Sequence, residues 1–485
     1  MTDRPGRAGR EGRPASLLFA VASLALAAFA SCGGPGEGGG APGASRGGGL
    51  GVDSGRGGAA RRPRVVLVGI DGADWRVIQP LVDRGQMPAF ARLQNEGVTA
   101  VLRSMEPSAS PSLWTTIATG VGPGRHRIQG FVVGAADPEA GGVEGPGGAP
   151  ASNRPPVRPV TSTMRRAPAF WNILPHFGLK TGVVGWLVTW PAEATDGFIV
   201  SSYLPYVYNW STGRPLKGTI VAGIPHQTFP EGLIDEIELL KVKPADLDPS
   251  TIRRFYDPTR VERLSREDRE CVEGFVWSLA CDETYRRIGL HLFDKYPVDL
   301  FAVYFGGVDV ASHRFWKFAN PDALDYHVRP EESAILGRVI DAYYTYVDGL
   351  VGEYLARLGP DDTLVVLSDH GFMPVLFPGR PNTSGHHRME GILAMWGRGV
   401  RRGARLKEAP GLLDVLPTIC ELLGLPIAMD LEGHVIDEAF DARFAIDHPK
   451  RFVESYDLPA PPAGPEESDL DRNVLERLRS LGYIN

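Results

Sequence analysis

Cysteine is scarce in this chain, and its scarcity limits how the fold can be stabilised. Only 4 of the 485 residues are cysteine, and those beyond residue 32 are Cys271, Cys281 and Cys420. Cys271 and Cys281 lie ten positions apart in a segment with helical periodicity, which separates them by about 15 Å, too far for a disulfide. None of the three has metal-binding spacing. We therefore expect free, buried thiols.

Dense runs of lysine and arginine are also missing beyond the extreme N-terminus, and the formal net charge is −7. A nucleic-acid-binding surface needs clustered positive charge, so the sequence gives no support for that class of protein. The composition is otherwise that of a globular protein, with 43% hydrophobic and 22% charged residues. A chain of this length can bury a sizeable core, as one large domain or two smaller ones.

The first 31 residues have the pattern of an export signal. Four arginines between residues 4 and 13 precede an apolar run over 17–29, which ends in Phe29-Ala30-Ser31-Cys32. This order is typical of a secretory signal peptide, and the last four residues resemble a bacterial lipobox. The resemblance implies cleavage before Cys32, lipidation of its thiol, and an exported, membrane-anchored lipoprotein of the bacterial cell envelope. A plain signal peptide or an uncleaved anchor is the alternative.

The rest of the chain divides by composition. Residues 32–62 are rich in glycine and cannot bury enough apolar surface to order themselves, so we expect a flexible tether. The main folded domain is predicted over 63–440, followed by a C-terminal extension over 441–485. Within the domain we expect a low-complexity surface insertion at 134–159 and an inserted cap at about 188–260.

Short apolar runs alternate with helical patterns through the domain. This alternation predicts an α/β fold with a doubly wound, largely parallel central sheet and helices on both faces. Helices are expected over 73–97 (broken near Gly85 and Pro88), 111–119, 170–177, 267–293, 331–358, 415–423 (with Asp414 as N-cap) and 475–483. Strands are expected over 64–70, 99–104, 181–186, 298–305, 363–367 and 391–396.

Polar side chains follow several of the predicted strands directly. In an open α/β sheet the carboxyl ends of the strands meet at one crevice. Three Asp, three His and one Ser converging there would hold two divalent cations with a nucleophile between them, as in a hydrolase. The motifs are Gly69-Ile70-Asp71-Gly72, Ser110-Pro111-Ser112-Leu113-Trp114, Asp309-Val310-Ala311-Ser312-His313, Ser368-Asp369-His370-Gly371-Phe372 and Gly385-His386-His387-Arg388-Met389-Glu390-Gly391.

In order and spacing, these motifs resemble the alkaline phosphatase superfamily. The likeness is greatest to the type I phosphodiesterase/nucleotide pyrophosphatase branch and its predicted phosphohydrolase/phosphomutase relatives. It covers residues about 64 to 440, with a gap of low similarity in the middle. The resemblance implies an alkaline phosphatase-like fold and a metal-dependent phosphoester hydrolase, specifically a phosphodiesterase, that acts on a small-molecule phosphoester.

The first cation site is expected to involve Asp309 and His313. They are four residues apart, so on a helix their side chains lie on one face and can bind one cation. The resemblance adds His387, which fits the family pattern Gly-x-His-Arg-x-Glu-Gly; His386 is the rival ligand.

The second cation site implied by the resemblance consists of Asp71, Asp369 and His370. Adjacent residues can converge in a sharp turn of the kind that Gly371 permits. Mixed His and carboxylate sets suit Zn, with Mn or Fe as alternatives.

The nucleophile follows from spacing within the resemblance. Relatives carry a Thr or Ser ten residues before the Gly of a Thr-Gly that ends a helix, and counting back from Thr119-Gly120 gives Ser110. Its hydroxyl would also bind metal, and Ser108 is the alternative. His126 is expected to be structural.

The sequence departs from its relatives at two points, which argue against nucleotide specificity and against sulfatase activity. Phe131 stands where the nucleotide pyrophosphatases carry an Asn, and the frame after Ser110 lacks the Arg that a sulfatase needs. The alternative functions are a phosphomutase or phosphotransferase of the same superfamily and a non-catalytic surface-binding lipoprotein.

Overall fold

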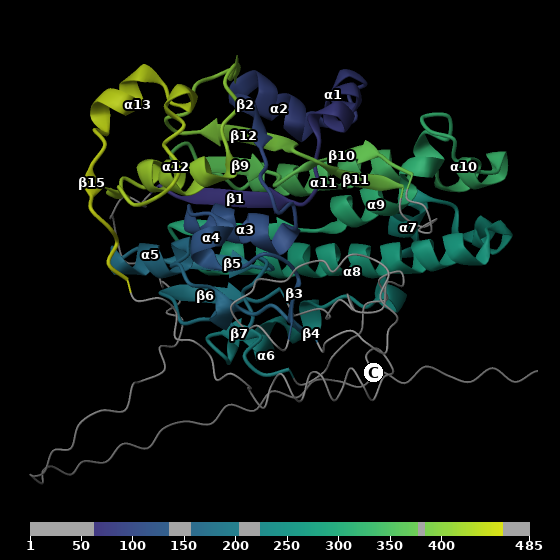
Figure 1. Ribbon diagram of the computed structural model, residues 1–485, viewed down its shortest axis with the longest axis horizontal. Coiled ribbons are helices and arrows are strands. Elements are labelled where there is room, and N and C mark those ends of the chain that lie inside the picture. Colours follow the sequence, from purple (N-terminus) through teal and green to yellow (C-terminus); the bar gives the residue numbers. More distant parts are fainter. Residues whose placement is uncertain (1–62, 135–156, 203–223, 377–383, 459–485) are drawn as a thin grey trace, which may run out of the picture. The chain divides into compact units, whose positions relative to one another are not determined.

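A nine-stranded sheet runs through the centre of the computed structural model, which describes residues 63–134, 157–202, 224–376 and 384–458 (Figure 1). The predicted signal peptide, the tether and the helix over 475–483 lie outside these residues. The strands, in spatial order, are β13 (Ala404–Arg405), β2 (Val98–Arg103), β12 (Glu390–Gly397), β9 (Thr363–Leu367), β1 (Val65–Ile70), β8 (Leu300–Phe305), β5 (Thr181–Val184), β6 (Gly197–Val200) and β7 (Thr228–Phe229).

The middle of the sheet is parallel, which confirms the predicted class. Strands β9, β1, β8, β5 and β6 pair in parallel, and β12 runs antiparallel to both β9 and β2. Every residue of β1 and β8 is buried. This is the burial expected of apolar strands that are covered on both faces.

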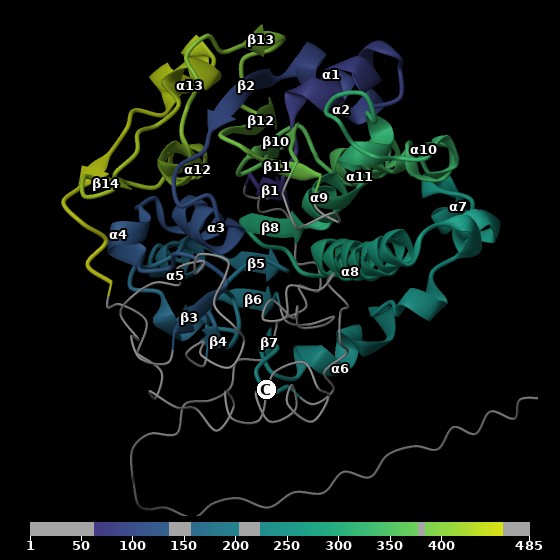
Figure 2. The same ribbon diagram turned by 45° about the vertical axis from the view of Figure 1, so that its right-hand side comes forward.

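Alternate side chains of β1 enter two different cores, because successive residues of a strand point to opposite faces. Val66 and Val68 belong to one core and Val65 and Leu67 to the other. Figure 2 shows the helices on the two sides of the sheet. One side carries α1 (Trp75–Asp83), α2 (Pro88–Glu96), α8 (Arg266–Lys295), α9 (Gly307–Ala319), α10 (Pro330–Leu336) and α11 (Val339–Leu355), and the other α3 (Ser110–Thr119), α5 (Phe170–His176) and α12 (Val415–Leu422).

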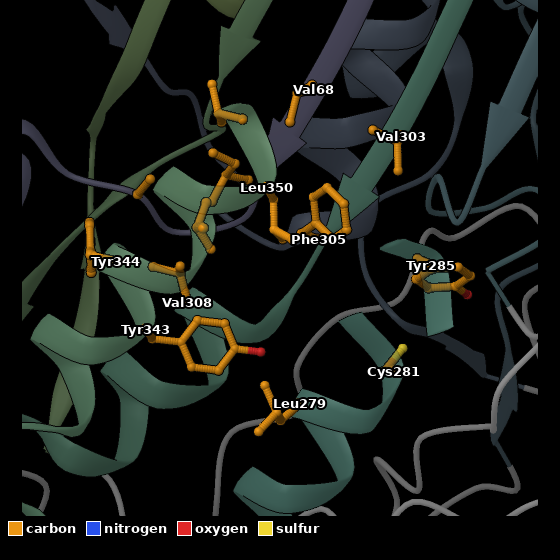
Figure 3. Close-up of a cluster of buried hydrophobic side chains, with 14 of the residues drawn as sticks. Val68, Leu279, Cys281, Tyr285, Val303, Phe305, Val308, Tyr343, Tyr344 and Leu350 are labelled. Carbon is orange, nitrogen blue, oxygen red and sulfur yellow. The ribbon is translucent and has the colours of Figure 1, made fainter. Parts of the chain in front are cut away.

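The core around α8, α9 and α11 is rich in aromatic side chains. Figure 3 shows Val68, Val303 and Phe305 of the sheet facing Val308 of α9, Tyr343 of α11 and Leu279 of α8. This packing fixes α9 against the sheet, directly beside the carboxyl ends of β1 and β8.

One predicted helix is divided in the structure. The single helix predicted over 331–358 is two helices, α10 and α11, separated at Gly337. The break falls at the two turn residues Gly337 and Arg338, and glycine is a weak helix former. Asp414 is the N-cap residue of α12, as predicted, although its side chain makes no capping hydrogen bond to that helix and accepts from the backbone of Gly411 and His434.

The segment predicted as a cap at 188–260 contributes in part to the sheet, because β6 and β7 lie within it. Its described remainder includes α6 (Leu233–Ile237) and α7 (Pro249–Phe255). The ends of the predicted insertion pair with each other as β3 (Val132–Gly134) and β4 (Val157–Pro159). The role of this segment as a cap stays a prediction.

The three cysteines after residue 32 are buried and form no disulfide, as predicted. Among the helices that the structure describes, none combines the length and apolar character needed to cross a membrane.

Candidate active site

The predicted site residues gather at the carboxyl edge of the parallel strands. Asp71 directly follows β1, and Asp369 and His370 follow β9. Asp309 and His313 lie on α9, which begins just after β8. The other two are Ser110, the first residue of α3, and His387 in the short strand β11 (Gly385–Arg388).

Asp71, Asp369 and His370 form one cluster, as the sequence implied. The Nε2 atom of His370 lies 3.2 Å from Asp71 Oδ1 and 3.5 Å from Asp369 Oδ2. All three residues are buried, and their ligand atoms lie close enough to hold one ion.

Asp309, His313 and His387 form a second cluster beside the first. Asp309 Oδ1 lies 3.4 Å from His313 Nε2 and 3.5 Å from His387 Nε2, and the two imidazole nitrogens are 3.0 Å apart. His370 Nε2 is also only 3.8 Å from Asp309 Oδ1. His370 therefore stands between the clusters and can serve either one.

The imidazoles are oriented as metal ligands usually are. The Nδ1 atoms of His313, His370 and His387 lie 2.9, 3.1 and 2.8 Å from the backbone carbonyls of Gly385, Gly371 and Ser108. Because a carbonyl can only accept, each Nδ1 carries the proton and each Nε2 presents its lone pair to the clusters. This arrangement fixes the tautomer that binds a cation.

Several atoms at the centre lack a partner. Within the described part of the chain, Asp309 Oδ1, Asp369 Oδ2 and His370 Nε2 are buried without a hydrogen bond. Buried polar groups are normally satisfied, and unpaired ones are costly. Unpaired carboxylate and imidazole atoms that converge at ligand spacing fit divalent cations.

Electrostatics also favour added positive charge. Burial, followed by the charge of Asp71, holds the pKa of Asp369 well above its usual range. Burial would also raise the pKa of Asp309, but His313 and His387 outweigh it and hold that pKa well below the usual range. Carboxylates crowded in a buried site repel one another, and a cation relieves this repulsion.

The hydroxyl of Ser110 lies beside the cluster of Asp71, Asp369 and His370. Its side chain is buried and donates a hydrogen bond to Asp71 Oδ1 at 3.5 Å. Ser108 meets the other cluster through its backbone, since its carbonyl oxygen is the acceptor for His387. The geometry favours Ser110 over Ser108.

The rival histidine faces away from the clusters. His386 is exposed, whereas His387 beside it in β11 points inward and is half-buried. Neighbouring residues of a strand point to opposite faces, so only one of the two can reach the site. The geometry favours His387.

Tyr304 was missed by the sequence reasoning. Its hydroxyl donates to Asp71 Oδ2 at 2.6 Å, and Trp114 Nε1 donates to the same oxygen at 3.1 Å. Tyr304 lies opposite Gly69 in the parallel register of β8 and β1. The sequence did contain a signal for this contact, because Tyr304 lies near the end of a strand that was predicted to belong to the same sheet as β1.

Glycine is required at position 371, but the sharp turn predicted there was wrong. Gly371 has no left-handed backbone and begins β10 (Gly371–Pro374). A Cβ there would lie 2.4 Å from the carbonyl oxygen of Glu390 and 2.5 Å from Asp74 Oδ2. Glycine is needed for this close approach and not for a sharp turn.

His126 is structural, as expected. It is buried, its Nε2 lies 3.0 Å from the hydroxyl of Thr116, and its Nδ1 accepts from the backbone of Ile128. Burial, followed by the charge of Arg165, lowers its pKa to about 3. It is therefore neutral and does not contribute to the clusters.

Comparison with known proteins identifies the family. The sequence profile of the type I phosphodiesterase / nucleotide pyrophosphatase family matches residues 65–414. The chain belongs to this family. Every residue of the two clusters lies inside the matched range, as does Ser110.

This phosphodiesterase-family chain also has partial similarity to characterised enzymes. It is 29% identical over 120 residues to a 2,3-bisphosphoglycerate-independent phosphoglycerate mutase of Clostridium perfringens. The matched stretch covers 24% of this chain and 22% of that enzyme. Among solved structures, it is similar to murine ectonucleotide pyrophosphatase / phosphodiesterase 5, with 13% identity over 78% of this chain and 100% of that one, at a TM-score of 0.42. An inactive variant of the same murine protein in complex with AMP gives 14% identity, 80% and 100% coverage, and a TM-score of 0.43.

Proposed function

We propose that this member of the family hydrolyses phosphodiesters with Ser110 as the nucleophile and two divalent cations as cofactors. The observation that carries the proposal is the buried hydroxyl of Ser110, 3.5 Å from Asp71 Oδ1 at the cluster of Asp71, Asp369 and His370. A buried serine beside converging carboxylate and imidazole atoms has the arrangement of an activated nucleophile.

The residues present would hold the cations in two sets. Asp71, Asp369 and His370 form the set nearest Ser110, whose hydroxyl would complete it. Asp309, His313 and His387 form the other set, and Zn suits this mixture of ligands, with Mn or Fe as alternatives. Bound cations would supply electrostatic stabilisation of the charge that develops on the attacking and leaving oxygens.

Ser110 performs the covalent step in this proposal. Its Oγ forms a bond to phosphorus, the bond from phosphorus to the leaving oxygen breaks, and the leaving group departs as an alcohol or its anion. Water then cleaves the phospho-serine and regenerates the hydroxyl. Ser110 is the first residue of α3, and the partial positive charge at the N-terminal end of a helix would favour an incoming anion.

Turnover of a bis-aryl phosphate by Ser110→Ala tests the proposal. Loss of the nucleophile is expected to slow turnover roughly a thousandfold, which corresponds to about 4 kcal/mol of barrier. Ser108→Ala is the matched control and should remain near the wild-type rate. A Ser110→Ala enzyme with near-normal turnover would reject the mechanism, and faster hydrolysis of aryl monoesters by the intact enzyme would reject only the diester preference.

A second candidate function is phosphoryl transfer, favoured by the similarity to the phosphoglycerate mutase. In that reaction an acceptor alcohol replaces water in the second step. Adding a small alcohol during turnover of the bis-aryl phosphate distinguishes the two functions, because a transferase forms a new phosphodiester in place of the aryl phosphomonoester that hydrolysis releases.

We also infer that the domain is exported and held at a membrane by lipidated Cys32, from the lipobox-like sequence before it. The test is partition of the protein expressed in bacteria between detergent and aqueous phases. The wild type should enter the detergent phase and Cys32→Ser should not. Full partition of the Cys32→Ser protein into detergent would show that another segment is the anchor.

A further inference from the structure

The helix that carries Asp309 and His313 is capped by a carboxylate from a different helix. The N-cap residue of α9 is Gly306, which has no side chain with which to satisfy the first N–H groups. Asp282 of α8 takes that role, because its Oδ1 accepts from Gly306 N at 3.1 Å and its Oδ2 from Gly307 N at 3.0 Å.

A third donor completes the arrangement. The hydroxyl of Tyr343 on α11 donates to Asp282 Oδ2 at 2.9 Å, and both side chains are fully buried. Figure 3 shows the Tyr343 ring projecting from α11 into the layer between Phe305 and Leu279. Asp282 thus ties the start of α9 to α8 and α11 at once.

The position of Gly307 leaves no room for a side chain beside Asp282 and Tyr343. A Cβ at Gly307 would lie 1.7 Å from the Tyr343 hydroxyl oxygen and 2.6 Å from Asp282 Oδ2. The backbone of α9 therefore approaches these groups as closely as a glycine allows. Asp309 is two residues further along the same first turn, and His313 follows one turn later.

We propose that Asp282 is a positioning residue for the cation site formed by Asp309, His313 and His387. By fixing the start of α9, its carboxylate sets where Asp309 and His313 place their ligand atoms. This inference rests on the proposed function, since it assumes that these residues bind a cation.

The chemistry requires a carboxylate and not merely a polar group. All three partners of Asp282 donate hydrogen bonds, and they arrive on both oxygens. An asparagine would place its NH₂ against a donor in either orientation, because each oxygen of Asp282 faces a backbone N–H. Outer groups that orient metal ligands typically change metal affinity 10- to 100-fold when they are lost.

The chain contains a matched control. Asp348 of α11 caps α2 in the same manner, accepting from Ala89 N at 3.2 Å and Phe90 N at 2.9 Å. It is buried as well, but α2 carries none of the proposed ligands. Asp282→Asn and Asp348→Asn therefore both remove a buried cap, and only the first should disturb cation binding.

The experiment is calorimetric titration of metal-free full-length protein with Zn²⁺ and, separately, Mn²⁺, together with thermal melting of the metal-free variants. We expect Asp282→Asn to weaken one of two binding events 10- to 100-fold and to leave the other within about threefold. Asp348→Asn should leave both events within about threefold while it lowers the melting temperature. Tyr343→Phe, which removes only one donor, should weaken the same event as Asp282→Asn by a smaller factor.

Equal affinity losses in the two Asn variants, or wild-type affinity in a folded Asp282→Asn protein, would overturn the proposal. If Asp282→Asn does not fold, the cation affinity of Tyr343→Phe becomes the deciding measurement. Wild-type affinity in the Tyr343→Phe protein would then contradict the proposed role of Asp282. Failure of the proposed function can be distinguished from failure of the role proposed for Asp282. The first would appear as normal turnover by Ser110→Ala, whereas the comparison of cation affinities does not depend on turnover.

Discussion

Tyr304 holds one oxygen of Asp71 so that the other faces the proposed cation site. The phenol of Tyr304 donates to Asp71 Oδ2 at 2.6 Å. Asp71 Oδ1 then lies 3.2 Å from His370 Nε2 and 3.5 Å from the Ser110 hydroxyl. A carboxylate fixed in this way binds through a single oxygen at a set position.

Tyr304→Phe should weaken cation binding at the site formed by Asp71, Asp369 and His370 by about tenfold. The ring and its packing remain, so the loss of one hydrogen bond should cost only about 1 kcal/mol of stability. Metal titration of the metal-free protein measures the first effect and chemical denaturation the second.

Tyr285→Phe is the control for this variant. Its phenol donates to the backbone of Ser201 at 3.2 Å and does not touch Asp71. A Tyr304→Phe protein that binds metal as tightly as Tyr285→Phe would show that Trp114 alone positions Asp71.

The sequence predicted well those elements whose signal is local. Residues 65–70, 300–305 and 363–367 are short apolar runs, and each formed a buried strand of the central sheet. Asp71, Asp369 and His370 follow these strands and Asp309 lies in the first turn of the helix after β8, whereas Ser110 and His387 were predicted through the family resemblance. Parallel pairing then brought the ends of the strands to one edge.

The features that were missed depend on contacts between distant segments. The need for glycine at 371 reflects the close approach of the backbone of Glu390. The hydrogen bond from Tyr304 to Asp71 joins residues that are 233 positions apart. Periodicity records neither kind of contact, because it describes only which face of an element is apolar.

His387→Ala should lower both cation content and phosphodiester turnover, whereas His386→Ala should change each by less than about twofold. His387 Nε2 lies 3.5 Å from Asp309 Oδ1, while His386 is exposed on the other side of β11. Loss of one of three ligands typically removes most of the affinity of a site. Elemental analysis of the purified variants measures the content, and equal losses in both would mean that the register of β11 is wrong.

Removal of the cations should make stability fall as pH rises. Burial, followed by the charge of Asp71, raises the folded-state pKa of Asp369 well above its usual range. A carboxyl with a raised folded-state pKa contributes stability that is fully present below its unfolded value of about 4 and is lost as pH rises through the folded-state pKa. The metal-free protein should therefore melt at a lower temperature at pH 8 than at pH 5.

Asp282 and Asp348 act in the same direction, because burial raises their pKa values to about 7 and about 6. His126 acts in the opposite direction between pH 5 and about 6.5, because burial, followed by the charge of Arg165, lowers its pKa to about 3. Comparison with Asp369→Asn isolates the contribution of the site, since this variant keeps all three of those groups. In metal-free protein, Asp369→Asn should show a smaller decrease in melting temperature between pH 5 and pH 8, and should melt above the wild type at pH 8. Added cation should reverse that order, because it takes the place of the proton on Asp369 in the wild type and binds the variant weakly. Parallel pH profiles for the two metal-free proteins would show that repulsion among the site carboxylates does not limit stability, and would remove the electrostatic argument for cation binding.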